Sequence, residues 1–418
     1  MTHTIEIVAT SLFALAILHT FLASRFERLA HTQSSHAGLW HFFGEVEAVF
    51  GIWAFVLVVT MAVAIGTSGA VAYLEGLNFT EPMFVFAIMV VAASKPVIHF
   101  CRWLVHGVAR VLPLPANLSL FFVMLSLVPL MGSFVTEPAA MTLAALMLRE
   151  RFYSKGISAR LKYATLGVLF VNVSIGGTLT HFAAPPVLMV AGTWGWDAAF
   201  MFSNFGWKAL VAVLFNAAVL TAVFSGELRG LESSREKAQN DRMPGIVIGI
   251  HLAFLAGVVI FAHHPVVFMM LFLLFLGFAT AYGRFQDRLI LREGLMVALF
   301  LAGLVILGSL QKWWLQPLLS GMNDTVLFFG ATALTAITDN AALTYLGSLV
   351  EGVGDGFKYA LVAGSVAGGG LTVIANAPNP AGFAMLKNYF PDQAINPLGL
   401  LAAALGPTAV AIAAFKLL

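Results

Sequence analysis

The chain has 418 residues, of which 60% are hydrophobic and 10% charged, and its net charge is +2. Soluble globular proteins carry about 25% charged residues, so this composition excludes an ordinary soluble domain. The small net charge gives no indication of nucleic-acid binding. Cys101 is the single cysteine, which excludes an intramolecular disulfide and a cysteine metal site. Apolar stretches of about twenty residues recur along the chain and predict an all-α polytopic membrane protein.

The apolar stretches fall into two sets with a charged segment between them. No basic leader or small-residue cleavage site accompanies the first stretch, so we interpret it as a retained span and not as a signal peptide. The first set comprises 4–22, 46–66, 82–100, the pair 117–136 and 138–148, an interrupted stretch 161–191, and 205–224. The second set comprises 244–261, 265–282, 293–310, the pair 322–338 and 340–350, an interrupted stretch 358–386, and 396–415.

Both sets have the same order: three spans, a pair of short elements, a broken helix and a last span. The second arm of each pair is too short to cross a bilayer comfortably, which predicts two re-entrant helical hairpins. Each half then crosses five times, so the second half must be inverted relative to the first. We therefore predict two inverted-topology repeats, 1–225 and 244–418, with about ten crossings and a linker at 226–243. Such repeats are typical of secondary transporters.

The basic residues predict the orientation. With both hairpins returning to their own side, most Lys and Arg residues, including those of the linker, collect on one face. The positive-inside rule makes this face cytoplasmic and places both termini outside the cytoplasm.

Four polar motifs interrupt the apolar sequence, two in each half. Gly and Pro break helices and free backbone carbonyls, which together with Ser, Thr and Asn oxygens suit Na⁺. Packing kinks are the alternative interpretation. The predicted ion ligands at the hairpin turns are Ser133, Thr136, Thr338 and Asn340, and those in the broken helices are Asn172, Ser174, Asn376 and Asn379. The predicted helix breaks involve Gly176, Gly177, Pro185, Pro186, Gly369 and Pro378.

Glu137 and Asp339 lie at the two hairpin turns and are the central candidates. A charged residue inside a bilayer costs roughly 2.5–3.5 kcal/mol even on the lenient insertion scale. Desolvation favours the neutral acid, which would let a proton and a cation compete for one carboxylate. The alternative is that each acid only caps the N-terminus of a short helix.

Other polar residues have open roles. Lys95, in the third stretch, either pairs with a site carboxylate or extends to the cytoplasmic face. His181 could relay protons, although a lone histidine is more often structural. Glu45 and Glu47 at the edge of a span are expected to be interfacial.

The four motifs resemble those of the ion transporter superfamily, and most of the chain is similar to the bacterial family of putative Na⁺/H⁺ antiporters. The runs 183–186, Ala-Ala-Pro-Pro, and 377–380, Ala-Pro-Asn-Pro, are similar to broken-helix ends in the more distant divalent-anion/sodium symporters. At the hairpin tips, however, an acid replaces the Asn of those symporters, which would disfavour a dicarboxylate. The resemblance implies an elevator-like motion within a homodimer.

The sequence therefore predicts a secondary transporter that exchanges Na⁺ or Li⁺ for H⁺ across an inner membrane, with no cofactor. A Na⁺-coupled organic-anion symporter is the alternative. An intramembrane enzyme is disfavoured because H-E-x-x-H and G-x-S-x-G are absent, and Gly352-Val353-Gly354-Asp355 lies in a polar loop without a partner acid. A channel would not need matched broken helices around two acids.

Overall fold

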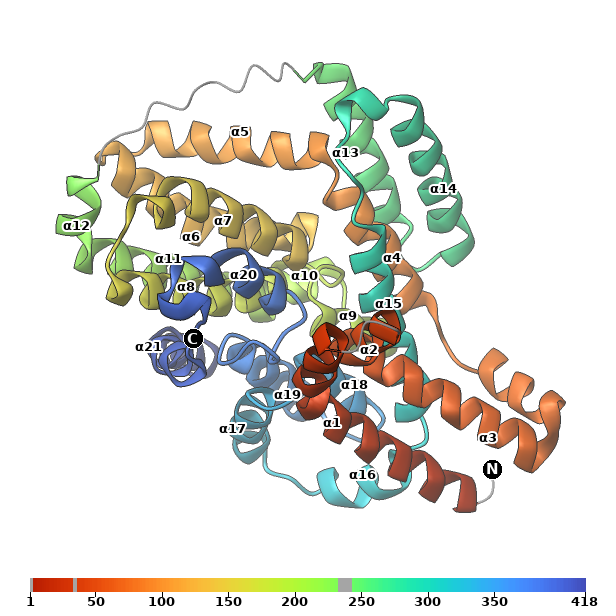
Figure 1. Ribbon diagram of the computed structural model, residues 1–418. Coiled ribbons are helices and arrows are strands. Elements are labelled where there is room, and N and C mark those ends of the chain that lie inside the picture. The colour runs from red at the N-terminus through yellow and green to blue at the C-terminus, as the bar shows by residue number, and fades with distance from the viewer. Residues whose placement is uncertain (1–2, 33–35, 232–242) are drawn as a thin grey trace.

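The computed structural model describes residues 3–32, 36–231 and 243–418, and every regular element in them is a helix (Figure 1). Most of the predicted linker, 232–242, lies outside the described residues. The helices before residue 232 are α1 (His3–Thr32), α2 (Ala37–Gly44), α3 (Val46–Glu75), α4 (Thr80–Ala92), α5 (Lys95–Val111), α6 (Ala116–Val135), α7 (Glu137–Arg151), α8 (Ala159–Gly176), α9 (Pro185–Trp194), α10 (Ala198–Met201), α11 (Trp207–Val223) and α12 (Ser225–Gly230), the last of which lies largely in the predicted linker. Those after it are α13 (Gly245–Ile260), α14 (Pro265–Ala281), α15 (Leu291–Gly308), α16 (Lys312–Leu319), α17 (Asp324–Thr335), α18 (Asn340–Ser348), α19 (Asp355–Gly368), α20 (Asn379–Leu386) and α21 (Pro397–Leu417).

The helices pack into two groups. The peripheral bundle contains α1–α4 and α13–α15, and the hairpin bundle contains α6–α9, α11 and α17–α21. In Figure 1 the peripheral bundle lies on the right and the hairpin bundle on the left and in the centre. Each bundle therefore combines helices from both predicted halves of the chain, with α5 and α16 as the connections between bundles.

Close helix crossings depend on small residues. A Cβ at Gly303 of α15 would lie 2.4 Å from the backbone of Phe50 in α3, and a Cβ at Gly167 of α8 would lie 2.6 Å from Ala403 in α21. Glycine allows these backbones to approach, as is usual between membrane helices.

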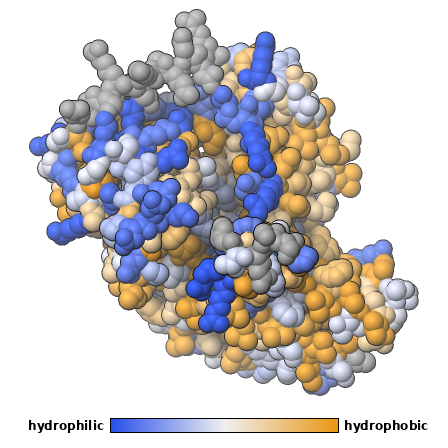
Figure 2. Space-filling view, in the orientation of Figure 1, coloured by the Kyte–Doolittle hydropathy of each residue, from blue (hydrophilic) through white to orange (hydrophobic). Residues whose placement is uncertain are grey.

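The outer surface is apolar where a soluble protein would be polar. Phe55 and Val63 of α3 are 70% and 85% exposed, and Met270 and Leu274 of α14 are both 63% exposed. Figure 2 shows hydrophobic residues gathered over the right and lower right of the molecule, where the peripheral bundle lies. Such a surface is stable against lipid, and the chain is a multi-pass membrane protein.

Six helices are long and apolar enough to cross a membrane within the described residues, or seven if a bent pair counts as one span. They are α1, α3, α6, α10 with α11, α15 and α21. Three shorter apolar helices, α13, α14 and α17, have 10–17 residues. About ten crossings therefore stay a prediction.

The span predicted at 82–100 is divided into two helices. The chain leaves helical geometry at Ser94 (φ −64°, ψ 145°), and α4 and α5 meet at an angle of 65°. Pro96 in the first turn of α5 has no N–H to donate, so α4 cannot continue through it. The helix α16 was not predicted from the sequence. The second span was predicted to end at Gly66, where α3 kinks (φ 82°) but continues to Glu75.

Candidate functional site

The first hairpin turns at a single strained residue. The helix α6 ends at Val135, Thr136 adopts φ 73° and ψ 150°, and α7 starts directly with Glu137. This backbone region is nearly restricted to glycine and costs about 1–3 kcal/mol for another residue. The turn holds Glu137 fully buried, with 0% of its surface exposed.

The second hairpin turns differently. Asp339 precedes α18 and caps it, because its Oδ1 accepts hydrogen bonds from the N–H groups of Ala341 (2.8 Å) and Ala342 (3.2 Å). Glu137, in contrast, is the first residue of α7 and does not cap it. The sequence had led us to expect the two acids at matching positions of the two hairpins, but the structure places them at different positions. Asp339 corresponds to Thr136, because each lies directly before the second helix of its hairpin. Glu137 corresponds to Asn340, because each is the first residue of that helix.

The first broken helix packs against the first turn. Ser133 Oγ donates to the carbonyl of Gly176 (2.7 Å) and accepts from the N–H of Leu179 (2.9 Å), and Thr180 donates to the carbonyl of Ser133 (2.6 Å). A Cβ at Gly177 would lie 2.4 Å from Glu137 Oε1, so only glycine leaves room for this carboxyl group. The prolines Pro185 and Pro186 then begin α9.

The second broken helix packs in the same way against the second turn. The N–H of Asn340 donates to the carbonyl of Ala375 (3.1 Å). Asn379, directly after Pro378, donates through Nδ2 to the carbonyls of Gly369 (2.8 Å) and Thr372 (2.9 Å). The two breaks also meet, because Ser174 donates to the carbonyl of Val366 (2.8 Å) and a Cβ at Gly369 would lie 2.2 Å from Ser174 Oγ.

One side chain joins the two turns. Asn376, from the second break, donates through Nδ2 to Glu137 Oε2 at 2.8 Å. Asn376 is 1% exposed and also lines a cavity whose wall includes Asp339. The two turns and the two breaks thus form one connected interior site.

Several oxygen atoms in this site are buried without a hydrogen-bond partner. Buried polar atoms are almost always paired, because leaving one unpaired costs about 1–3 kcal/mol. The unpaired oxygens are Thr136 Oγ1, Glu137 Oε1, Asn340 Oδ1, Asn376 Oδ1 and Asn379 Oδ1. Carboxylate, hydroxyl and amide oxygens are the ligand types that suit a hard monovalent cation. The described residues contain no group of three or more His, Cys, Asp or Glu that could hold a metal ion.

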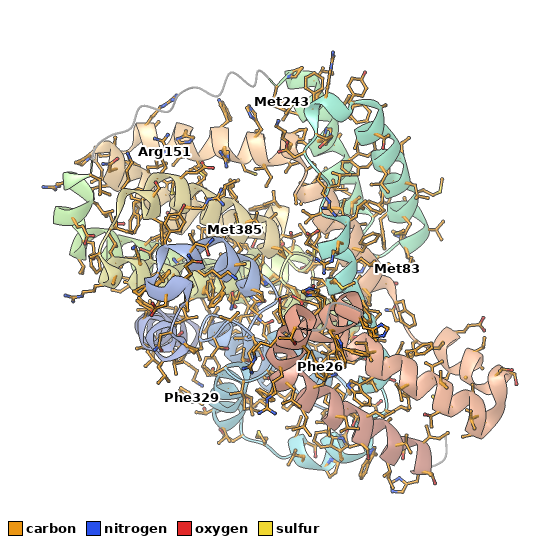
Figure 3. All side chains as sticks on the ribbon, viewed as in Figure 1. Phe26, Met83, Arg151, Met243, Phe329 and Met385 are labelled. Carbon is orange, nitrogen blue, oxygen red and sulfur yellow. The ribbon has the colours of Figure 1, made fainter. Side chains whose placement is uncertain are left out.

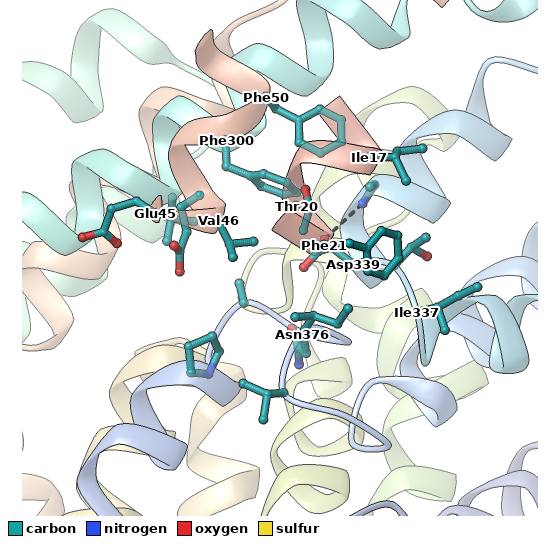
Figure 4. Close-up of a pocket in the computed structure, with 18 of the residues that line it drawn as sticks. Ile17, Thr20, Phe21, Glu45, Val46, Phe50, Phe300, Ile337, Asp339 and Asn376 are labelled. Atoms are coloured by element: carbon teal, nitrogen blue, oxygen red, sulfur yellow. Dashed lines mark hydrogen bonds between the residues drawn. The ribbon is translucent and has the colours of Figure 1, made fainter. Parts of the chain in front are cut away.

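The cavity beside the site has a volume of about 340 Å³ and lies between the two bundles. Figure 4 shows Asn376 at the bottom of this cavity, and Phe50 and Phe300 at the top. Thr338 and Asp339 of the second turn line it as well. Thr338 donates its hydroxyl to the carbonyl of Leu334 (2.8 Å).

Three predicted site residues have other surroundings. Asn172 donates to the carbonyls of Leu125 (2.8 Å) and Val213 (3.2 Å) and accepts from Asn216 (3.0 Å), so its amide joins helices and does not offer a free oxygen. Lys95, the first residue of α5, lies 3.5 Å from Asp287. His181 stacks on His263 with ring centroids 5.7 Å apart.

Two polar residues near the site were not predicted from the sequence to belong to it. Asn216 is buried in α11, and its signal was an amide inside an otherwise apolar stretch. Glu47 was expected to be interfacial, yet it lines the same cavity as Asp339.

The fold and this interior site define a polytopic membrane protein with a buried, oxygen-rich polar centre between two broken helices. A family model described as "Putative Na+/H+ antiporter" matches residues 4–418, and the chain belongs to this family. No curated protein matches the chain. Family membership favours a transporter over an enzyme, with Na⁺ and H⁺ as its substrates.

Proposed function

We propose that the protein exchanges Na⁺ or Li⁺ for H⁺ by alternating access, with Glu137 as the group that binds either the proton or the cation. The observation that carries this proposal is the set of buried, unpaired oxygens in the two turns and the two breaks, together with a fully buried carboxyl group. A cation bound by these oxygens would satisfy them and neutralise the carboxylate. A proton on Glu137 would neutralise it without the cation.

Competition at one carboxyl group makes this exchange obligatory. The charged acid is costly in a water-excluded site unless a cation accompanies it. The site therefore changes its exposure from one side of the membrane to the other when Glu137 carries a proton or a cation, and rarely when it carries neither. If unequal numbers are exchanged, each net charge moved gains about 2.3 kcal/mol per 100 mV of membrane potential.

The arrangement of helices supports an inverted-repeat architecture. Both halves follow the same order, and each contributes its first helices to the peripheral bundle and its hairpin and broken helix to the hairpin bundle. We propose ten crossings, with α6–α7 and α17–α18 as re-entrant hairpins, the linker in the cytoplasm and both termini outside. Arg151 and Met243 lie along the same upper edge of the molecule in Figure 3, as expected for one cytoplasmic face.

We further propose that the hairpin bundle moves against the peripheral bundle within a homodimer. The cavity between the two bundles supports such a motion, since apolar surfaces that enclose a cavity can separate and close without breaking many polar contacts. The homodimer follows from the family resemblance alone.

A Na⁺-coupled organic-anion symporter is the alternative in the same superfamily. The N-termini of α7 and α18 point partial positive charge toward the site, which would favour a carboxylate substrate. Glu137 and Asp339 would repel it.

Reconstitution into liposomes containing a pH-sensitive dye separates these functions. The exchanger predicts a pH change on addition of Na⁺ or Li⁺ and no uptake of labelled dicarboxylates. Dicarboxylate uptake that requires Na⁺, without a pH response to Na⁺ alone, would establish the symporter instead.

A further inference from the structure

The cavity next to the site is bounded by both bundles. The peripheral bundle contributes Phe13 and Thr20 of α1, Glu47 and Phe50 of α3, and Phe300 of α15. The hairpin bundle contributes the second turn, α18 and the second helix break. Its volume of about 340 Å³ far exceeds the roughly 10–15 Å³ that holds one water molecule. It can therefore hold a hydrated ion.

The charged groups that line this cavity are all acidic. They are Glu27, Glu45, Glu47 and Asp339, and the described lining includes no Lys, Arg or His. Glu45 forms an ion pair with Arg292, which lies outside the lining and neutralises that acid. The side chain of Glu27 is exposed on the surface of the protein. Glu47 and Asp339 are the other two acids of the lining, one from each bundle.

A second observation points to a ligand in the same place. Asn376 is 1% exposed and lines the cavity, and its Oδ1 has no hydrogen-bond partner. Its Nδ2 is held by Glu137, so the amide oxygen is the end that remains available to a ligand. Asp339 accepts both capping hydrogen bonds through Oδ1, which leaves the lone pairs of Oδ2 for a ligand.

We propose that Glu47 and Asp339, with Asn376 Oδ1, form a second cation subsite that receives a partly hydrated Na⁺ or Li⁺ before it reaches Glu137. The inference rests on the proposed exchange function and adds Glu47 to it. The remaining lining is largely apolar and aromatic, and a cleft of one charge sign with low-dielectric walls concentrates counter-ions by about 10–10³-fold. The subsite thus raises the local cation concentration next to the buried carboxyl group.

The residues around the cavity indicate from which side of the membrane a cation reaches the subsite. Its outer acids, Glu27 and Glu45, also line a neighbouring surface cavity together with His41 and Arg292. These residues lie near the end of α1, in α2, at the start of α3 and at the start of α15, all on the face that the basic residues assign to the cytoplasm. The subsite accordingly loads from the cytoplasmic side.

Substitution of Glu47 tests the subsite by its effect on cation affinity. In liposomes loaded with a pH-sensitive dye, Glu47→Gln raises the apparent KM for Na⁺ by about tenfold and leaves the rate at saturating Na⁺ close to that of the unmodified protein. Glu47→Asp restores most of the affinity. Glu75→Gln, at the far end of the same helix α3, is the matched control and changes neither value. An unchanged KM in Glu47→Gln, with exchange intact, overturns the subsite.

Thiol labelling gives a readout that does not depend on exchange. Cys101 is the single cysteine and is buried, so Cys101→Ala provides a background for Thr20→Cys on the cavity wall. Na⁺ slows the reaction of this cysteine with a charged, membrane-impermeant thiol reagent applied from the cytoplasmic side, and Glu47→Gln abolishes the protection. Protection that persists in Glu47→Gln contradicts the subsite. Protection without any Na⁺-driven proton flux contradicts the exchange function and leaves the subsite standing.

Discussion

Asn376 Nδ2 donates a hydrogen bond of 2.8 Å to Glu137 Oε2 across 239 residues of sequence. This bond connects the second helix break to the first hairpin turn, so the two halves of the chain share one site. Replacing Asn376 by Ala removes a hydrogen bond to a charged group, which contributes about 1.5–3 kcal/mol. We expect Asn376→Ala to lower Na⁺ affinity at least about tenfold, measured as the apparent KM in liposomes. Asn204→Ala, which loses only a bond to the carbonyl of Phe200, serves as the control. Equal KM values in both variants would remove Asn376 from the site.

Asp339 has two separable functions, as a helix cap and as a charge. Asn caps helices about as well as Asp, so Asp339→Asn keeps the fold while it removes the negative charge. We expect this variant to elute as a folded protein from size-exclusion chromatography and to raise the apparent KM for Na⁺ in dye-loaded liposomes, as loss of a charge from the loading subsite should. Asp197 caps α10 through the N–H of Phe200 (2.7 Å) and offers the matched control Asp197→Asn. If Asp339→Asn exchanges like Asp197→Asn, capping is the whole role of Asp339.

Thr136 combines a strained backbone with a buried, unpaired hydroxyl group. Thr136→Gly relieves about 1–3 kcal/mol of strain, less the roughly 1 kcal/mol by which glycine favours the unfolded chain. We expect thermal unfolding in detergent to move to a higher temperature while Na⁺ affinity falls. Thr136→Ser should retain the affinity and the strain. A gain in both stability and affinity in Thr136→Gly would mean that the hydroxyl does not bind the ion.

Gly177 provides the space for the Glu137 carboxyl group. In Gly177→Ala the new Cβ would lie 2.4 Å from Oε1 in the present geometry, so the carboxyl group has to move. We expect a folded protein with a loss of exchange comparable to that of a Glu137 variant, measured in dye-loaded liposomes. Gly249→Ala, in α13, has nothing within 4 Å of its Cβ and should exchange normally. Normal exchange in Gly177→Ala would show that the position of Glu137 tolerates displacement.

Several residues of the site could be predicted from the sequence because a polar residue in an apolar stretch is costly to bury in a membrane and therefore indicates a function. Glu137, Asn376 and Asn340 were identified in this way, and the structure brings them into one connected site. The helix breaks were equally visible, since Gly and Pro interrupt regular apolar runs. Local sequence therefore predicted which residues leave the helices.

Long-range packing was not predictable in the same way. Asn172 was expected to offer an oxygen to an ion, yet its partners Asn216, Leu125 and Val213 come from other helices that a single sequence does not place. Glu47 lines the same cavity as Asp339 only because the two bundles enclose that cavity together. The bend between α4 and α5 was missed because both helices together look like one apolar run.

Proton flux in Glu137→Gln is the most direct test of the central claim. Glutamine keeps an acceptor for Asn376 Nδ2 and the shape of the side chain, but it can neither lose a proton nor carry a negative charge. In liposomes containing a pH-sensitive dye, we predict that Na⁺ drives a pH change with the unmodified protein and with Glu75→Gln, and none with Glu137→Gln. Full Na⁺-driven proton flux in Glu137→Gln would contradict exchange at this carboxyl group.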